Sequence, residues 1–397
     1  MSIAITNASL LLGKELDYVD NGYVEIENRV IKGAGAGNYK GAGKKLDGND
    51  FLVIPGLVNA HTHIADSIGK DIAAGRRLDA RVHPVFGAKK KILENSRPEH
   101  LKAFIRSSAI SMMKKGIVAF ADFREGGPEG VGLLREAIAG LPVKCIALGR
   151  VDHYGSPKDA AGLPPEAVEK ARQVLRLADG LGVSGANENT DAALLEYREL
   201  AGKKLLAIHA AESKETVEFS QAHTGRSEVD RIMEHMKPDF VVHMTNATEN
   251  EMSLVAKSGT GIVICPRANG VLGAGIPSVA RMLRQGCTVA LGTDNVMLNS
   301  PDMLRELDYI WKASRAVEGE MVDAREILKM ATVNAAQILR MKSGCIEAGR
   351  AADLVFIDKK HADLYPMHDP HAAIVHRLSE SSIKAVMIDG RFVEAIN

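Results

Sequence analysis

The middle of the chain alternates short apolar segments with longer helical patterns, and this alternation constrains the fold more than any other feature of the sequence. Apolar residues recur at helical spacing in stretches such as 97–116 and 164–180, and the short apolar segments lie between such stretches. Alternation of this kind is typical of βα units, whose strands run parallel within one sheet. Strand candidates occur at 55–63, 116–123, 143–150, 182–188, 203–211, 239–245, 260–267 and 287–294.

These units predict an α/β fold with a (β/α)₈ TIM-type barrel over residues 55–344, since such barrels have ~250 residues and tolerate insertions. Residues 1–54 and 345–397 differ, because they combine alternating apolar residues with glycine, asparagine and aspartate turns. That pattern predicts short strands, and we expect the two ends to form one small composite β-sandwich domain. The glycine-rich stretch 33–45 does not lead from a strand into a helix, which favours a flexible turn over a phosphate-binding loop.

The charge balance and the cysteines exclude several classes of protein. Fifty basic and fifty acidic residues give a formal net charge of zero, so the basic bias of nucleic-acid-binding and membrane-surface proteins is absent. The four cysteines are far apart, which argues against a disulfide framework and for a reducing compartment. The start of the chain lacks a signal-peptide pattern, and no apolar run approaches the ~20 residues that span a bilayer. We therefore expect a cytoplasmic protein. The lysine run Lys89–Lys91 is expected to lie on a solvated helix face.

Polar side chains with metal-binding or acid–base chemistry follow several strand candidates directly. His61 and His63 end the segment PGLVNAHTH, and residues two apart on a strand point to the same face. Because the carboxyl ends of barrel strands meet at one mouth, residues at other strand ends would join them there. The residues concerned are His61, His63, His209, Glu212, His243 and Asp294.

Each of these residues has a plainer explanation when it is taken alone. A histidine at a strand end, such as His209 or His243, is more often a surface residue or a hydrogen-bonded core residue. The pair Thr293 and Asp294 is more often a turn or a helix N-cap. The ordered set HxH, HxxE, H and D at four strand ends favours a functional site. The histidines of the segment 361–376 instead lie in a loop-like stretch, and we expect surface or packing roles for them.

The chain resembles the amidohydrolase superfamily in the order of its motifs. These motifs are PGLVNAHTH, HAAES, VHMTNATENEM, CPRANGVLG, LGTDNVMLNSPDM and GCIEAGRAADLVFID. The similarity covers nearly the whole chain and is greatest to the cytosine deaminase-like branch of aminohydrolases and chlorohydrolases, which act on adenosylhomocysteine, guanine and triazine substrates. The resemblance implies a barrel with a composite β-sandwich, a small heterocyclic substrate and a homo-oligomer.

The resemblance also implies a set of metal ligands. His61 and His63 resemble the ligands of the first strand, His209 resembles that of the fifth, and Asp294 resembles that of the eighth. Three imidazoles and one carboxylate suit Zn²⁺, with Fe²⁺ as the alternative. Binuclear members of the superfamily carry a carboxylated lysine on the fourth strand. The segment 180–191 contains no lysine, which favours one divalent ion per chain.

Glu212 and His243 are implied to have acid–base roles. Glu212 in HAAE resembles the glutamate that shuttles protons, and His243 resembles the histidine that orients the attacking water. One carboxylate can act as both base and acid if it reaches both atoms, and Asp294 would orient the water as well as bind metal. The expected reaction is hydrolytic deamination of an amino-substituted pyrimidine, purine or pterin. Hydrolysis of a cyclic amide or a carbon–halogen bond is the alternative, and a non-catalytic scaffold is disfavoured because every ligand is present.

Substrate contacts are less well defined by the sequence. The segment CPRANGVLG departs from the Asn-Pro-x-Ser-Asn pattern of the branch, because Cys265 and Ala268 replace its first Asn and its Ser. Arg124, at the mouth of the second strand, suits an anionic or carbonyl-bearing substrate edge. Asp66 follows HTH and could also face the substrate, although a loop salt bridge is its plainer role. The candidates for substrate contact are Asp66, Arg124, Asn187 and Asn269.

Overall fold

A computed structural model describes residues 2–393, and its larger sheet contains the strands predicted for the middle of the chain. The strands of this sheet lie in the order β13-β12-β11-β10-β9-β8-β7-β6-β14, and neighbouring strands are parallel. They are β6 (Leu57–His63), β7 (Ile117–Arg124), β8 (Lys144–Gly149), β9 (Gly180–Gly185), β10 (Leu205–Ala210), β11 (Phe240–His243), β12 (Gly261–Ile264), β13 (Val289–Leu291) and β14 (Asp294–Asn295).

The two end strands of this order are nearly continuous in sequence. Only Gly292 and Thr293 separate β13, which pairs with β12, from β14, which pairs with β6. The sheet therefore curls back on itself. This closed, parallel arrangement confirms the TIM-type barrel that the βα alternation predicts. A Cβ atom at Gly292 would lie 2.7 Å from the Cβ atom of His61, so this junction requires a glycine.

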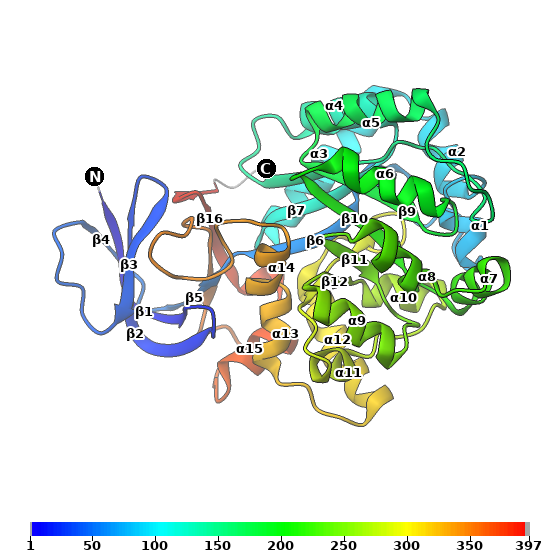
Figure 1. Ribbon diagram of the computed structural model, residues 1–397. Coiled ribbons are helices and arrows are strands. Elements are labelled where there is room, and N and C mark those ends of the chain that lie inside the picture. The colour runs from blue at the N-terminus through cyan, green and yellow to red at the C-terminus, as the bar shows by residue number, and fades with distance from the viewer. Residues whose placement is uncertain (1, 394–397) are drawn as a thin grey trace.

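Helices follow the strands and surround the sheet (Figure 1). Every residue of β6 and β7 is buried, as expected for parallel strands that are covered on both faces. Local sequence sets helix ends: Thr248 and Glu251 form a capping box at the start of α9, and Gly259 in the left-handed region ends it. The helices from α3 onward in this part of the chain are α3 (Pro98–Lys114), α4 (Gly127–Ile138), α5 (Pro165–Leu177), α6 (Asp191–Ala201), α7 (Lys214–Thr224), α8 (Glu228–Arg231), α9 (Glu249–Ser258), α10 (Pro266–Leu272), α11 (Val279–Arg284), α12 (Met303–Glu318), α13 (Ala324–Met330) and α14 (Val333–Ile338).

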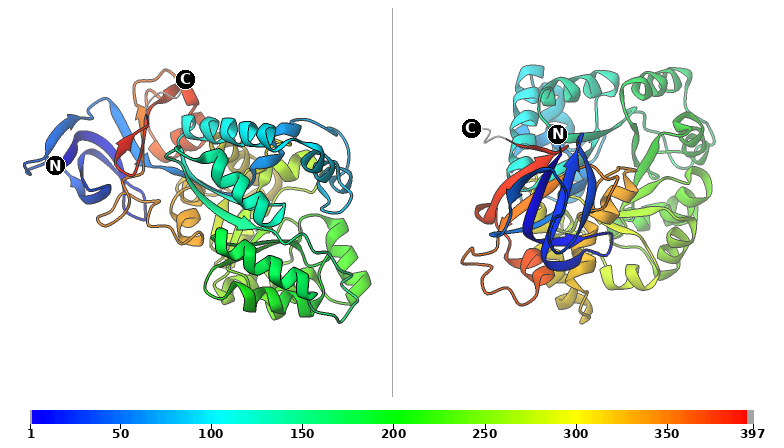
Figure 2. Two further views of the ribbon diagram at one scale, coloured as in Figure 1. Left: turned by 90° about the horizontal axis from the view of Figure 1, so that it is seen from above. Right: turned by 90° about the vertical axis from the view of Figure 1, so that its left-hand side faces the viewer.

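A second sheet combines strands from both ends of the chain. Its main path runs β17-β16-β15-β5-β1-β2-β3, with β4 also paired to β1. The pairing of β5 with β15 joins the two ends, and Figure 2 shows the blue and red strands side by side. The turn expected over 33–45 is shorter than predicted, because residues 33–36 belong to β3 and residues 44 and 45 belong to β4. The strands are β1 (Ile3–Leu12), β2 (Asp17–Glu27), β3 (Val30–Ala36), β4 (Lys44–Asp47), β5 (Phe51–Pro55), β15 (Leu354–Asp358), β16 (Ile383–Ile388) and β17 (Arg391–Phe392).

A long connection leads from β6 to α3 and contributes to the site described below. It contains a 3₁₀ helix (Ile64–Gly69) followed by α1 (Leu78–Val82) and α2 (Ala88–Asn95). The last helix, α15 (Pro370–Arg377), lies between β15 and β16 in sequence and packs against α12 and α13. Within residues 2–393, the structure contains no helix that is both long enough and apolar enough to cross a membrane.

Candidate metal centre and active site

The strand-end residues singled out from the sequence converge in the barrel. His61 and His63 lie at the end of β6, His209 is the next-to-last residue of β10, and Asp294 is the first residue of β14. Their ligand atoms form two compact groups, in each of which all atoms lie within 4.8 Å of one another. The first group is His61, His63 and His209, and the second is Glu212, His243 and Asp294. Residues 233 positions apart in sequence are thus in direct contact.

The donor atoms are spaced as the ligands of one metal ion would be. Two ligands at 2.0–2.1 Å from a tetrahedral zinc ion lie about 3.3 Å from each other. The distance is 3.2 Å between His61 Nε2 and Asp294 Oδ1, and 3.4 Å between the Nε2 atoms of His63 and His209. His63 Nε2 lies 3.6 Å from Asp294 Oδ1. Three imidazoles and one carboxylate therefore fit a single divalent ion.

The protonation states of these side chains also suit metal binding, which requires neutral imidazoles and an ionised carboxylate. Burial lowers the pKa of His63 to about 3, and the charge of Lys89 adds to the effect. Burial likewise holds the pKa of His209 well below its ordinary value. Burial acts to raise the pKa of Asp294, but the hydrogen bond with His61 and the neighbouring imidazoles outweigh it, so this pKa lies below its usual range.

Glu212 and His243 lie together beside the ligand set. Glu212 Oε1 is 3.6 Å from His243 Nε2, and the other ring nitrogen of His243 is 3.3 Å from Asn269 Nδ2. Burial raises the pKa of Glu212, and the proximity of His243 partly offsets this. A carboxylate with a raised pKa can hold a proton nearer neutral pH, which is what a proton shuttle requires.

The backbone is unusual at two of these positions. His243 has a φ angle of 77° and Asp294 has one of 58°, so both adopt the left-handed region although neither is a glycine. Such conformations cost of order 1–3 kcal/mol and persist where the surrounding structure fixes them. His243 at the end of β11 and Asp294 at the start of β14 both line the cavity at the mouth of the barrel.

A cavity of about 90 Å³ opens onto the cluster. The ligands His63, His209 and Asp294 line it together with Glu212 and His243. Among the four residues predicted to contact substrate, Asn187 is part of this lining, and its Nδ2 atom donates a hydrogen bond to the Thr216 carbonyl oxygen. The acidic residues Glu188 and Glu228 also line the cavity.

The structure places the other three substrate candidates in different settings. Both carboxylate oxygens of Asp66 accept hydrogen bonds from within the chain, from Asn295 Nδ2 and from the backbone N–H of Met297. Asn269 is fully buried and contacts the His243 ring. Arg124 lines a neighbouring cavity of about 530 Å³. Substrate contact by Asp66, Arg124, Asn187 and Asn269 stays a prediction.

Three charged residues at the site were missed by the sequence analysis. Lys89 was expected on a solvated face, but it is only 5 % exposed, and it lines both cavities because α2 packs over the barrel mouth. Arg150 lies directly after β8 and also lines both cavities. Glu125 follows β7 directly. The strand-end rule that selected the histidines applies equally to Arg150 and Glu125, whereas nothing in the sequence marked Lys89.

Comparisons with known proteins agree with this geometry. Residues 52–393 match the family model described as "Amidohydrolase family". A protein of Methanothermobacter thermautotrophicus named "Putative aminohydrolase" is 39% identical over 99% of both chains. A 5-methylthioadenosine/S-adenosylhomocysteine deaminase of Halobacterium salinarum is 29% identical over 94% of this chain and 88% of its own length. The solved structure of a Xanthomonas campestris adenosine deaminase with bound zinc has a TM-score of 0.85 at 22% identity, covering 98% of this chain and 92% of that one.

These matches confirm the resemblance seen in the sequence motifs. The family match covers the whole barrel and part of the second sheet, and the relatives align over nearly the full length of this chain. The likeness to the zinc-containing structure supports the barrel and its additional sheet. The chain belongs to the amidohydrolase family.

Proposed function

We propose that this protein is a metal-dependent hydrolase that deaminates an amino-substituted nitrogen heterocycle. The observation that carries the proposal is the convergence of four suitable metal ligands with a separate carboxylate–histidine pair at one cavity. The names of the relatives, an aminohydrolase and a deaminase of adenosine-type compounds, support this reaction class. The substrate class is therefore a small heterocycle of the pyrimidine, purine or pterin type.

We assign His61, His63, His209 and Asp294 as the ligands of one divalent ion per chain, with zinc expected first and iron as the alternative. When bound, such an ion would activate water as a nucleophile at neutral pH. The fourth barrel strand, β9, contains no lysine that could carry a bridging carboxylate, which supports a single ion. Asp294 Oδ1 lies 3.2 Å from His61 Nε2 and 3.6 Å from His63 Nε2, which suits a shared ion. The carboxylate of Asp294 would bind the ion and also orient the water.

Glu212 would move the protons of the reaction. Its carboxylate lines the cavity and would take a proton from the attacking water and deliver it to the ring nitrogen. It would then take the remaining proton of the added hydroxyl group and deliver it to the departing amine. His243, held by Asn269 on its far nitrogen, would orient the water and the developing charge on the substrate. Ammonia leaves, and a carbonyl oxygen replaces the amino group on the ring.

We propose the same domain boundaries as those expected from the sequence. Residues 55–344 would form the catalytic barrel, and residues 1–54 and 345–397 would form the two parts of a β-sandwich. The pairing of β5 with β15 supports a single domain made from both ends of the chain.

The test is ammonia release by the zinc- or iron-loaded protein across a panel of aminated pyrimidines, purines and pterins. Glu212→Gln should retain the metal and lower kcat by about 10²- to 10⁴-fold, the usual contribution of general acid–base catalysis. Glu215→Gln is the matched control, because Glu215 is an exposed glutamate three residues away. Near-wild-type turnover in Glu212→Gln would remove Glu212 from the mechanism. Release of halide or opening of a cyclic amide, without ammonia, would establish the alternative hydrolase chemistry.

A further inference from the structure

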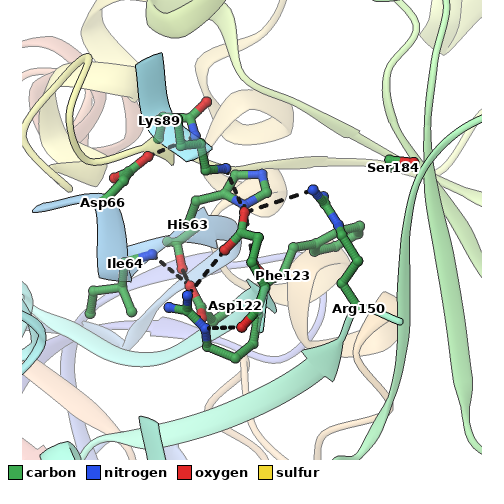
Figure 3. Close-up of polar contacts among 12 residues, drawn as sticks. His63, Ile64, Asp66, Lys89, Asp122, Phe123, Arg150 and Ser184 are labelled. Atoms are coloured by element: carbon green, nitrogen blue, oxygen red, sulfur yellow. Dashed lines mark hydrogen bonds and ion pairs between the residues drawn. The ribbon is translucent and has the colours of Figure 1, made fainter. Parts of the chain in front are cut away.

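Glu125 lies where the second barrel strand ends, close to one of the proposed metal ligands. Its side chain is only 13% exposed, and its Oε1 atom is 2.8 Å from His63 Nδ1. The same oxygen is 2.6 Å from Lys89 Nζ, so a buried lysine and a metal-ligand candidate share one carboxylate oxygen. Figure 3 shows the side chains of His63, Lys89 and Arg150 directed toward one another.

Positive charges surround this carboxylate. Besides Lys89, Arg124 Nη2 lies 3.3 Å from Glu125 Oε2, and Arg150 Nη1 lies 3.8 Å from Glu125 Oε1. Lys89, Arg124 and Arg150 are all buried. Three cationic side chains within 4 Å favour the ionised form of the Glu125 carboxylate, which lies in a site that water barely reaches.

The three imidazoles of the ligand set differ in what holds their second ring nitrogen. His209 Nδ1 is 2.6 Å from the Ser184 carbonyl oxygen and 3.2 Å from that of Val183, so only the backbone fixes it. His61 Nδ1 is buried and has no hydrogen-bond partner among residues 2–393. His63 Nδ1 is different, because it faces a side-chain carboxylate.

The contacts of His63 define its tautomer. Its Nδ1 atom forms a hydrogen bond of 3.1 Å with the Phe123 carbonyl oxygen, which can only accept, so Nδ1 carries the hydrogen. Glu125 Oε1 lies 2.8 Å from the same nitrogen as an ion-pair contact. The lone pair is then on Nε2, which faces His209 and Asp294. A carboxylate on the outer nitrogen of an imidazole also makes the inner nitrogen a stronger ligand, and losing such a partner typically costs 10–100-fold in metal affinity.

We propose that Glu125 is a positioning residue for the metal centre, which fixes the ring of His63 and raises its basicity. Lys89 holds the Glu125 carboxylate in place from α2, and this contact ties the connection between β6 and α3 to the metal centre. The proposal concerns metal binding and does not depend on which bond the enzyme hydrolyses.

The test compares the zinc affinity of the metal-free protein, measured by competition with a chromophoric chelator, among wild type, Glu125→Gln and Glu129→Gln. Glu129 is an exposed glutamate in the first turn of α4 and serves as the control. Glu125→Gln should bind zinc about tenfold more weakly or worse, and the absorption bands of its cobalt-loaded form should shift. Glu129→Gln should match wild type in both measurements. A zinc affinity within twofold of wild type for Glu125→Gln would overturn the proposal and leave the Phe123 carbonyl as the sole orienting group.

A second variant separates positioning from charge balance, because Glu125→Gln leaves three buried cations with less compensating charge. The double variant Lys89→Met/Glu125→Gln removes one charge of each sign, so its net charge equals that of wild type. If Glu125 acts on His63, the double variant should show the same weakening of zinc binding and the same cobalt spectrum as Glu125→Gln. Wild-type affinity in the double variant would mean that the pair only balances charge, and the proposal would be wrong. The unfolding temperature of each metal-free variant identifies any loss of affinity that results from misfolding.

Discussion

Two regions of this molecule are rich in histidine, and only one of them brings its imidazoles together. In the metal cluster, defined as His61, His63, His209 and Asp294, the residues come from distant parts of the sequence and their ligand atoms lie within 3.6 Å of a neighbour. In the C-terminal segment 361–376, histidines are close in sequence, yet none of them belongs to a ligand group within residues 2–393. Strand ends in a barrel converge, whereas neighbours along a loop and a short helix point in different directions.

Three histidines of the C-terminal segment, His361, His371 and His376, each have a separate partner. His361 contacts Asp363 and Ser381, and His368 is exposed. His371 is buried, and its Nε2 atom is 2.7 Å from the Leu16 carbonyl oxygen. His376 stacks on Trp311, with 4.9 Å between the ring centroids. The surface and packing roles expected for these histidines agree with these contacts.

The largest effect should come from removing the metal. A ligand that binds only the folded state stabilises it by about 4 kcal/mol when present at a thousand times its dissociation constant. We expect a chelator to lower the unfolding temperature of the wild-type protein, as measured by calorimetry, and zinc to restore it. An unchanged unfolding temperature, with zinc removal verified by elemental analysis, would contradict a metal site in the barrel.

His209→Ala should have the next largest effect and should abolish the response to chelator. Loss of one of four ligands removes about a quarter of the roughly 10–16 kcal/mol of a structural zinc site, which is about a hundredfold or more in affinity. Elemental analysis after purification should show clear loss of zinc in His209→Ala. The matched control is His371→Ala, which should keep a full complement of the ion. Full metal retention in His209→Ala would remove this residue from the ligand set.

His371→Ala should change stability without changing metal binding. The substitution leaves the buried Leu16 carbonyl oxygen without its partner, and an unsatisfied buried acceptor costs about 1–3 kcal/mol. Urea denaturation of the metal-free proteins should show this loss in the free energy of unfolding. If His371→Ala instead lost metal while its unfolding free energy was unchanged, the separation of the two histidine regions would be wrong.

The smallest effect should come from His376→Ala. Its partly exposed ring contributes a stacking contact with Trp311, and aromatic pairs of this kind contribute about 0.5–1.5 kcal/mol. Urea denaturation of this variant beside His371→Ala should therefore rank it as the milder change. A larger loss in His376→Ala than in His371→Ala would show that stacking outweighs the buried hydrogen bond in this segment.

Sequence reasoning could predict that these residues lie together because the rule behind the prediction is topological, and the family resemblance supplied their expected roles as ligands. Parallel strands followed directly by His63, His209 or Asp294 place these side chains at one end of the barrel, whatever the details of packing. The same reasoning could not find Lys89, because a run of three lysines on a short helix gives no sign of which one is buried. The Lys89 ammonium group is buried against the Glu125 carboxylate at the end of β7, and this contact joins residues that are not neighbours in sequence.

Sequence patterns also did not predict the interruption of the last barrel strand. The segment 287–294 was expected as one strand, but it divides into β13 and β14 around Gly292. At this point the backbone changes partner, since the Gly292 N–H donates to the Ile264 carbonyl oxygen and the Thr293 N–H donates to that of His61. The approach of β6 is so close that any side chain at Gly292 would collide with His61. Such a requirement is visible only once the two strands lie side by side.

The pairing of β6 with β14 means that the proposed metal site can be completed only late in the synthesis of the chain. His61 is made early and Asp294 late, because they stand 233 positions apart. During synthesis, a chain still attached to the ribosome holds an incomplete ligand set until the last barrel strand has emerged and closed against the first. With the proposed ligand set, full coordination of the ion requires the completed barrel, and we expect a chain truncated before Asp294 to bind the ion more weakly.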